Sequence, residues 1–126
     1  MGKEFVAVMA DGTRRFAATM SIGRASLFYE ISLLLERYVK RSCGIAPDNG
    51  NDEHQIDPEV FIAFFEEVWA QRWLGEAEGF IHGWAAHAAG IIENITLQPR
   101  AWVDRRGVPL KVQRYLRDDE LGSQSS

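Results

Sequence analysis

The chain has 126 residues, of which 46% are hydrophobic and 25% are charged, and its formal net charge is −4. This is the size and composition of one folded domain, and it excludes a chain that is disordered throughout. No run of 18 apolar residues occurs, and no apolar stretch follows a basic N-terminus, so we expect neither a membrane span nor a secretion signal. We expect one cytoplasmic globular domain over residues 1–117 and a polar, frayed tail over residues 118–126.

The charge is divided into segments. Residues 1–43 carry a net +3, residues 44–96 a net −9, residues 97–117 a net +5 and the tail a net −3. The favoured interpretation is that basic and acidic elements pack side by side and neutralise each other locally. The alternative is an exposed field that attracts a charged partner.

The N-terminal residues predict a β-hairpin. Residues 4–10 and 14–20 are extended, apolar-rich runs separated by Asp11-Gly12, a dipeptide that favours tight turns because both residues tolerate positive φ. A hairpin alone is marginally stable, so other elements must cover it.

A helix is predicted over residues 22–42, with Ser21 as its N-cap and Gly44 after its end. Tyr29 and Leu33 fall on its polar side, where we expect them to be exposed without a special role; a contact patch is the alternative. Its apolar residues form one arc that we expect to face the core: Leu27, Phe28, Ile31, Leu34, Leu35, Tyr38 and Val39.

Residues 46–55 predict a polar loop. The spacing of its acids from Asp48 onward fails the calcium-loop pattern, because Glu53 stands where a glycine is required. We therefore expect no metal there, and no cofactor is predicted elsewhere.

Asp57-Pro58-Glu59 is a strong helix start, and the helix is expected to continue to about residue 74. Its aromatic residues cover a wide arc, which implies burial on two sides or an exposed aromatic patch. Arg72 lies within that arc, so its stem should extend along the aromatics or its charge should pair with a carboxylate. Residues of this helix and of the turn after it form the predicted acidic and aromatic partner interface: Glu59, Glu66, Glu67, Trp69, Trp73, Glu76 and Glu78.

A further helix over residues 80–95 follows a glycine break at residues 75–79. One strip of it holds only small residues, Gly79, Gly83, Ala86 and Gly90. Because interior glycines destabilise a helix, this strip predicts a close neighbour. The first or second helix is the expected neighbour, and the same strip of a second copy, giving a homodimer, is the alternative.

A second hairpin is predicted from residues 101–103 and 108–112, with a turn at residues 104–107 and Pro109 on an edge strand. The expected fold is α+β: a small antiparallel sheet of about four strands from two β-hairpins, packed against three α-helices. A helical body with two independent hairpin arms is the alternative.

Catalytic motifs are missing. His82 has Glu78 one turn before it, which favours a surface ion pair over a metal or catalytic site, and His87 is expected to be a half-buried ring. His54 is expected in the polar loop. Cys43 follows a helix end, where a reactive thiolate is disfavoured.

These observations favour a non-enzymatic protein-interaction module: an adaptor, an assembly factor or an inhibitor that blocks a basic surface on another protein, of a kind found in phages and mobile elements. A nucleic-acid-binding protein is the first alternative, and a small enzyme with a site around His82 or His87 is the second. The nucleic-acid alternative rests on basic residues and one aromatic on the two hairpins: Arg14, Arg15, Arg100, Trp102, Arg105, Arg106 and Lys111.

Overall fold

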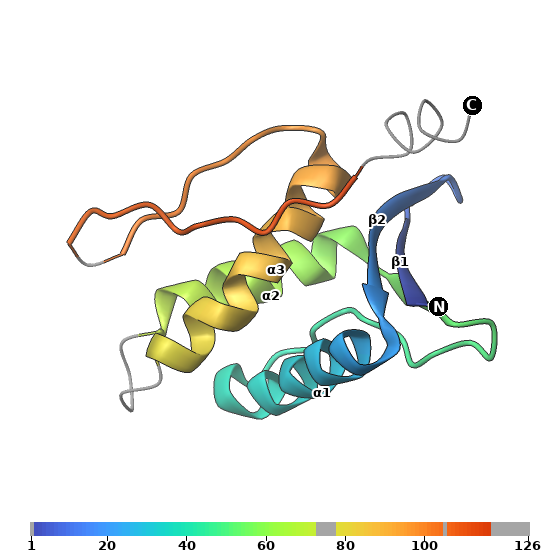
Figure 1. Cartoon of the computed structure of the whole chain (residues 1–126), viewed down its shortest axis with the longest axis horizontal. Coiled ribbons are helices and arrows are strands. Elements are labelled where there is room, and N and C mark those ends of the chain that lie inside the picture. The colour runs from blue at the N-terminus through green and yellow to red at the C-terminus, as the bar shows by residue number, and fades with distance from the viewer. Residues whose placement is uncertain (1, 73–77, 105, 117–126) are drawn as a thin grey trace.

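The computed structural model describes residues 2–72, 78–104 and 106–116. Their order is β1 (Gly2–Val8), β2 (Arg14–Ser21), α1 (Ile22–Val39), β3 (Glu53–Ile56), α2 (Pro58–Ala70) and α3 (Glu78–Thr96). The fold is α+β, as predicted, with the sheet beside three helices (Figure 1). The tail over residues 118–126 lies outside the described residues.

The sheet differs from the prediction. It has three strands in the order β2-β1-β3, and it is mixed because β3 runs parallel to β1. The β1–β2 hairpin is confirmed, with antiparallel pairing and a register shift between Phe5 and Val6. Strand β3 comes from the segment expected to be a polar loop. Its side chains alternate in burial, and His54 and Ile56 point inward.

The second predicted hairpin does not join the sheet. The chain does reverse there, but the described residues of the two arms form one isolated bridge, between Val103 and Pro109, and no strand. Backbone amides of Asp104 and Leu110 also donate hydrogen bonds across the arms. Proline has no amide hydrogen to donate, which limits the ladder there. The arms project along α3 instead of beside β1 and β2 (Figure 1). The returning arm, residues 108–116, is called the C-terminal limb below.

Helices α1 and α2 begin where the sequence predicts, whereas α3 begins at Glu78, two residues before the predicted start. The hydroxyl of Ser21 caps α1 by accepting a hydrogen bond from the amide of Arg24, and the Asp57 side chain caps α2 through the amide of Val60. Each cap satisfies one of the amides that a helix start leaves unpaired. Helix α1 ends in a left-handed residue, Lys40, with φ 57°.

Helix α1 is rotated relative to the predicted arc. Leu27 and Leu34, expected in the core, are each 61% exposed, whereas Ala25 and Ser32 are fully buried. The two small residues allow α1 to approach closely, and the Oγ of Ser32 accepts a hydrogen bond from Nε1 of Trp84 at 2.9 Å. Tyr29, expected to be exposed, lies partly buried with its ring 4.7 Å from that of His54. Ala25 and the buried hydroxyl of Ser32 thus determine which side of α1 faces the core, although the spacing of the leucines predicted a different side.

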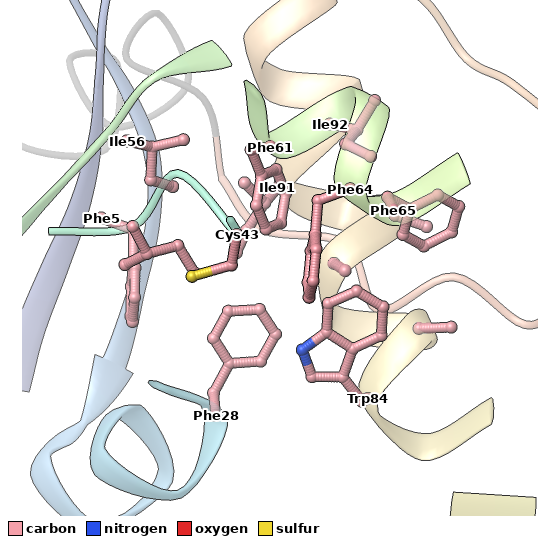
Figure 2. Close-up of a cluster of buried hydrophobic side chains, with 14 of the residues drawn as sticks. Phe5, Phe28, Cys43, Ile56, Phe61, Phe64, Phe65, Trp84, Ile91 and Ile92 are labelled. Carbon is pink, nitrogen blue, oxygen red and sulfur yellow. The ribbon is translucent and has the colours of Figure 1, made fainter. Parts of the chain in front are cut away.

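One core joins the sheet to all three helices. Figure 2 shows Phe5 and Ile56 from the sheet, Phe28 from α1 and Trp84 from α3 meeting around one cluster. Trp84 stacks on Phe28 at 6.1 Å and packs edge-on against Phe64 of α2 at 5.7 Å. Burial raises the pKa of the Cys43 thiol, which lies in this core, to about 12, so a thiolate is disfavoured there.

Candidate functional site

The most exposed apolar side chains of α1 and α3 define the first candidate site. Phe80 is 87% exposed, and Leu27 and Leu34 are 61% exposed. These three residues are called the α1–α3 face below. On α1 the two leucines are two helical turns apart and lie on one stripe. Exposed leucines are ordinary singly, but a row of them beside an almost fully exposed phenylalanine is typical of a contact surface.

Phe80 belongs to the same side of the molecule as α1. It precedes Trp84 by one helical turn, so both side chains project from the same side of α3. Trp84 contacts α1 through Phe28 and Ser32. The first turns of α3 lie beside the second half of α1, and α1 forms an outer border of the molecule in this view (Figure 1).

The predicted acidic and aromatic interface is only partly outward. Trp69 is 9% exposed and stacks on Phe65 at 6.2 Å, so it belongs to the core. Glu66 pairs with Arg100 at 3.0 Å, and the Glu67 carboxylate accepts a hydrogen bond from Gln71 at 2.6 Å. Glu59 is exposed and Glu78 lies 3.4 Å from His82. Trp73 and Glu76 lie outside the described residues.

Arg72 lies against an aromatic ring, as one of its two expected arrangements has it, and also binds backbone carbonyl groups. Its side chain is buried, its guanidinium lies 4.0 Å above the Trp69 ring, and it donates hydrogen bonds to the carbonyl oxygens of Trp69 and Val103. The ring face and the carbonyl groups both attract a cation. Arg72 therefore joins α2 to the first arm of the reversed chain.

The basic residues predicted to bind nucleic acid are largely used within the molecule. Arg14 pairs with Glu53, and Arg15 donates a hydrogen bond to the carbonyl of Ile95. Arg100 pairs with Glu66 and lies 5.2 Å from the centre of the Trp102 ring, which is buried. Arg106 and Lys111 are exposed, and Arg105 lies outside the described residues.

The small-residue strip of α3 has two different surroundings. A Cβ at position 90 would lie 1.8 Å from the carbonyl oxygen of Gln113, so the neighbour at this end is the C-terminal limb. The amide of Gln113 also donates a hydrogen bond to the carbonyl of Ala86 at 2.9 Å. The expectation that α1 or α2 supplies the close neighbour is wrong at Gly90. At Gly79 and Gly83, a Cβ would meet no atom of the described residues within 4 Å, so the small residues at this end have no close neighbour among them.

A cleft of about 530 Å³ between α3 and the C-terminal limb is the second candidate site. His82 and His87 line it from α3, and Asp104 and Lys111 line it from the reversed chain. Hydrogen bonds from the amides of Val108 and Arg106 lower the pKa of Asp104, so this carboxylate stays ionised. His82 stacks on Trp69 at 5.2 Å. These groups could bind a polar molecule or transfer a proton.

A larger hollow of about 690 Å³ lies where β1 ends beside the start of α2 and the end of α3. Its polar groups already have structural roles, because Asp57 caps α2 and Arg15 binds the carbonyl of Ile95. The rest of its lining is partly apolar, including Val8 and Ile62. It offers less acid–base chemistry than the histidine cleft.

His87 and Tyr115 link α3 to the C-terminal limb by a hydrogen bond between Nδ1 and the phenolic oxygen. Burial lowers the pKa of His87, and the positive charge of Arg24 adds to this shift. Burial raises the pKa of Tyr115 to about 12. Both groups are therefore held neutral in the folded protein near pH 7.

This pair predicts stability that decreases at both ends of the pH scale. The contribution of His87 is fully present above its ordinary pKa of 6.5 and is lost as the pH falls through the lower folded value, because the unfolded chain binds the proton first. The contribution of Tyr115 is fully present below pH 10.0 and is lost as the pH rises towards about 12. Urea unfolding at a series of pH values should show both losses.

The matched variants separate the two groups. His87→Gln should flatten the acidic side of the stability profile and leave the alkaline side unchanged, and Tyr115→Phe should do the reverse. Profiles of both variants that run parallel to that of the wild type would show that neither group is responsible.

Comparison with protein-family models, with characterised proteins and with solved structures finds no match. Within residues 2–72, 78–104 and 106–116, no helix is long and apolar enough to cross a membrane. In the same residues, no group of three or more histidine, cysteine or acidic side chains is placed to hold a metal ion.

Proposed function

We propose that the protein is a non-enzymatic protein-interaction module that binds its partner through the α1–α3 face. The observation that carries this proposal is the exposure of three large apolar side chains on two helices that contact each other: Phe80 of α3 is 87% exposed, and Leu27 and Leu34 of α1 are 61% exposed. The chain buries many other large apolar side chains in one core, so these three are exceptions within a well-packed molecule. A partner that covers these three side chains removes their apolar surface from water, which stabilises the complex.

The acidic side of α2 supports the proposal less well. A surface that blocks a basic partner needs free carboxylates and outward aromatics, but Trp69 is in the core and Glu66 already has Arg100. An adaptor or assembly factor that uses an apolar face fits the described residues better than an inhibitor that uses α2. The nucleic-acid alternative loses support for the same reason, since Arg14, Arg15 and Arg100 have partners within the chain.

The test replaces the exposed apolar groups with serine. Leu27→Ser, Leu34→Ser and Phe80→Ser together should weaken capture of the partner at least ~10-fold, because each removes apolar area that the complex buries. The melting temperature should stay close to that of the wild type, since these side chains contribute little to the core. Quantitative affinity capture and a thermal melt measure the two quantities.

A matched control uses exposed apolar residues elsewhere. Val108 and Leu116 are 52% and 41% exposed, and both belong to the C-terminal limb. Val108→Ser with Leu116→Ser should leave capture unchanged. Equal capture by both sets of variants and the wild type would contradict the proposal.

The second candidate function is acid–base catalysis in the histidine cleft, favoured by the meeting of His82, His87 and Asp104 around one hollow. A neutral imidazole can accept a proton from water near pH 7. Hydrolysis of a panel of chromogenic ester, phosphoester and glycoside substrates tests it. Turnover that disappears in both His82→Gln and His87→Gln would support catalysis, and turnover that survives in both would contradict it.

A further inference from the structure

The outer surface of α1 is basic as well as apolar. Arg24, Arg37 and Lys40 are exposed around Leu27 and Leu34, and Glu30 is the one exposed carboxylate of this helix. Within the described part of the chain, none of the three cations takes part in an ion pair, whereas Arg14, Arg100 and Arg114 each have a carboxylate partner. An acidic protein thus leaves unpaired positive charge around its most exposed leucines.

We infer that the α1–α3 face binds an amphipathic helix of a partner protein whose apolar stripe is flanked by aspartate or glutamate. The inference rests on the proposed function and names the chemistry of the partner. Apolar side chains of such a helix cover Leu27, Leu34 and Phe80, and its carboxylates face the cations of α1. The sequence predicted a partner with a basic surface, because the residues of α2 are acidic. The charges around the α1–α3 face are positive, so the partner inferred here is acidic instead.

The spacing of the face fits a helix. Leu27 and Leu34 are separated by two turns, about 10 Å along the axis at 1.5 Å per residue, which is the spacing of anchors on one side of a partner helix.

Glu30 favours a protein over a lipid surface. It follows Leu27 by three residues and precedes Leu34 by four, so its carboxylate lies on the same stripe as the two leucines. On an anionic membrane this charge would face lipid phosphates of the same sign, whereas a protein can offer it a single lysine or a polar group. A second copy fits less well, because the apolar residues of acidic helix α2, such as Phe61 and Phe65, are in the core.

The experiment selects partners from a display library of amphipathic helical peptides. All members share leucines at helical spacing, and the flanking positions vary among glutamate, glutamine and lysine. Peptides whose binding is lost in the Leu27→Ser, Leu34→Ser, Phe80→Ser variant identify ligands of the α1–α3 face. We expect these peptides to be enriched in glutamate at the flanks, and the best of them to bind at least ~10-fold more weakly to Arg24→Glu with Arg37→Glu. The control variant Arg106→Glu with Lys111→Glu reverses two exposed charges outside α1. It should leave peptide binding unchanged.

The outcomes separate the inference from the function on which it rests. Face-dependent peptides with neutral or lysine-rich flanks would overturn the acidic partner and leave the interaction module standing. A library that yields no face-dependent peptide would overturn both. Co-sedimentation of the wild-type protein with phosphatidylserine vesicles, lost in Arg24→Glu with Arg37→Glu, would overturn the protein partner in favour of a membrane surface.

Discussion

Replacing Gly90 with alanine is expected to lower the free energy of unfolding, while the same replacement at Gly83 is expected to raise it. At position 90 the new Cβ would lie 1.8 Å from the carbonyl oxygen of Gln113, so the C-terminal limb must move away. This movement lengthens or breaks the hydrogen bond from the Gln113 amide to the carbonyl of Ala86. Forcing extra volume into a packed contact costs about 1–3 kcal/mol. At position 83 a Cβ meets nothing within 4 Å, and alanine is about 1 kcal/mol more favourable than glycine in a helix interior.

Chemical denaturation of the two variants measures the effect directly. Both substitutions add one methyl group to the same helix, so helix propensity is the same for each, and a difference in sign comes from the surroundings. Two variants that are both more stable than the wild type would show that the C-terminal limb does not pack against Gly90.

The second large effect is expected at the hydrogen bond between Ser32 and Trp84. The Ser32 hydroxyl accepts from the indole nitrogen at 2.9 Å and donates to the carbonyl of Phe28 at 2.8 Å. Ser32→Ala leaves a buried indole N–H without a partner, which costs about 1–3 kcal/mol. Trp84→Ala removes the ring between Phe28 and Phe64 and should cost about 3–5 kcal/mol.

A double-mutant cycle isolates the polar part. Trp84→Phe keeps an aromatic ring but removes the donor, so Ser32→Ala should cost less in that background than in the wild type. Unfolding free energies of the two single variants and the double variant supply the cycle. Simple additivity would mean that the hydrogen bond does not contribute to stability.

Much of the fold follows from local signals in the sequence. Asp11 and Gly12 mark the first hairpin, and Ser21 and Asp57 begin two helices. Each of these signals acts within a few residues and depends little on distant packing. The hairpin, the helix starts and the α+β class were predictable for that reason.

Features decided by distant contacts were not predictable. Strand β3 has only four residues, too few for its alternation to be distinguished from loop sequence, and its pairing partner β1 is far away in the chain. The rotation of α1 depends on Ser32 meeting Trp84, and a buried serine is not expected on a core-facing stripe. Gly90 correctly predicted a close neighbour. That this neighbour is the C-terminal limb could not be predicted, because it depends on the second hairpin packing along α3 instead of joining the sheet.

The candidate sites show the same division. The sequence singled out His82 and His87, and the cleft that surrounds them is formed by the reversed chain that carries Asp104. It assigned Leu27 and Leu34 to the core, because their spacing on the helix is that of a buried stripe. Their exposure became visible only once the orientation of α1 was known.

Site-specific photo-crosslinking distinguishes the α1–α3 face from the acidic side of α2 as the partner interface. A photoreactive phenylalanine analogue at position 34 places the probe on the α1–α3 face, and the same analogue at exposed Glu59 places it on the acidic side of α2. In cells that express the protein from its own gene, we expect a crosslinked partner protein from position 34 and none from position 59. A partner crosslinked from position 59 and not from position 34 would show that the interface lies on the acidic helix α2 and not on the α1–α3 face.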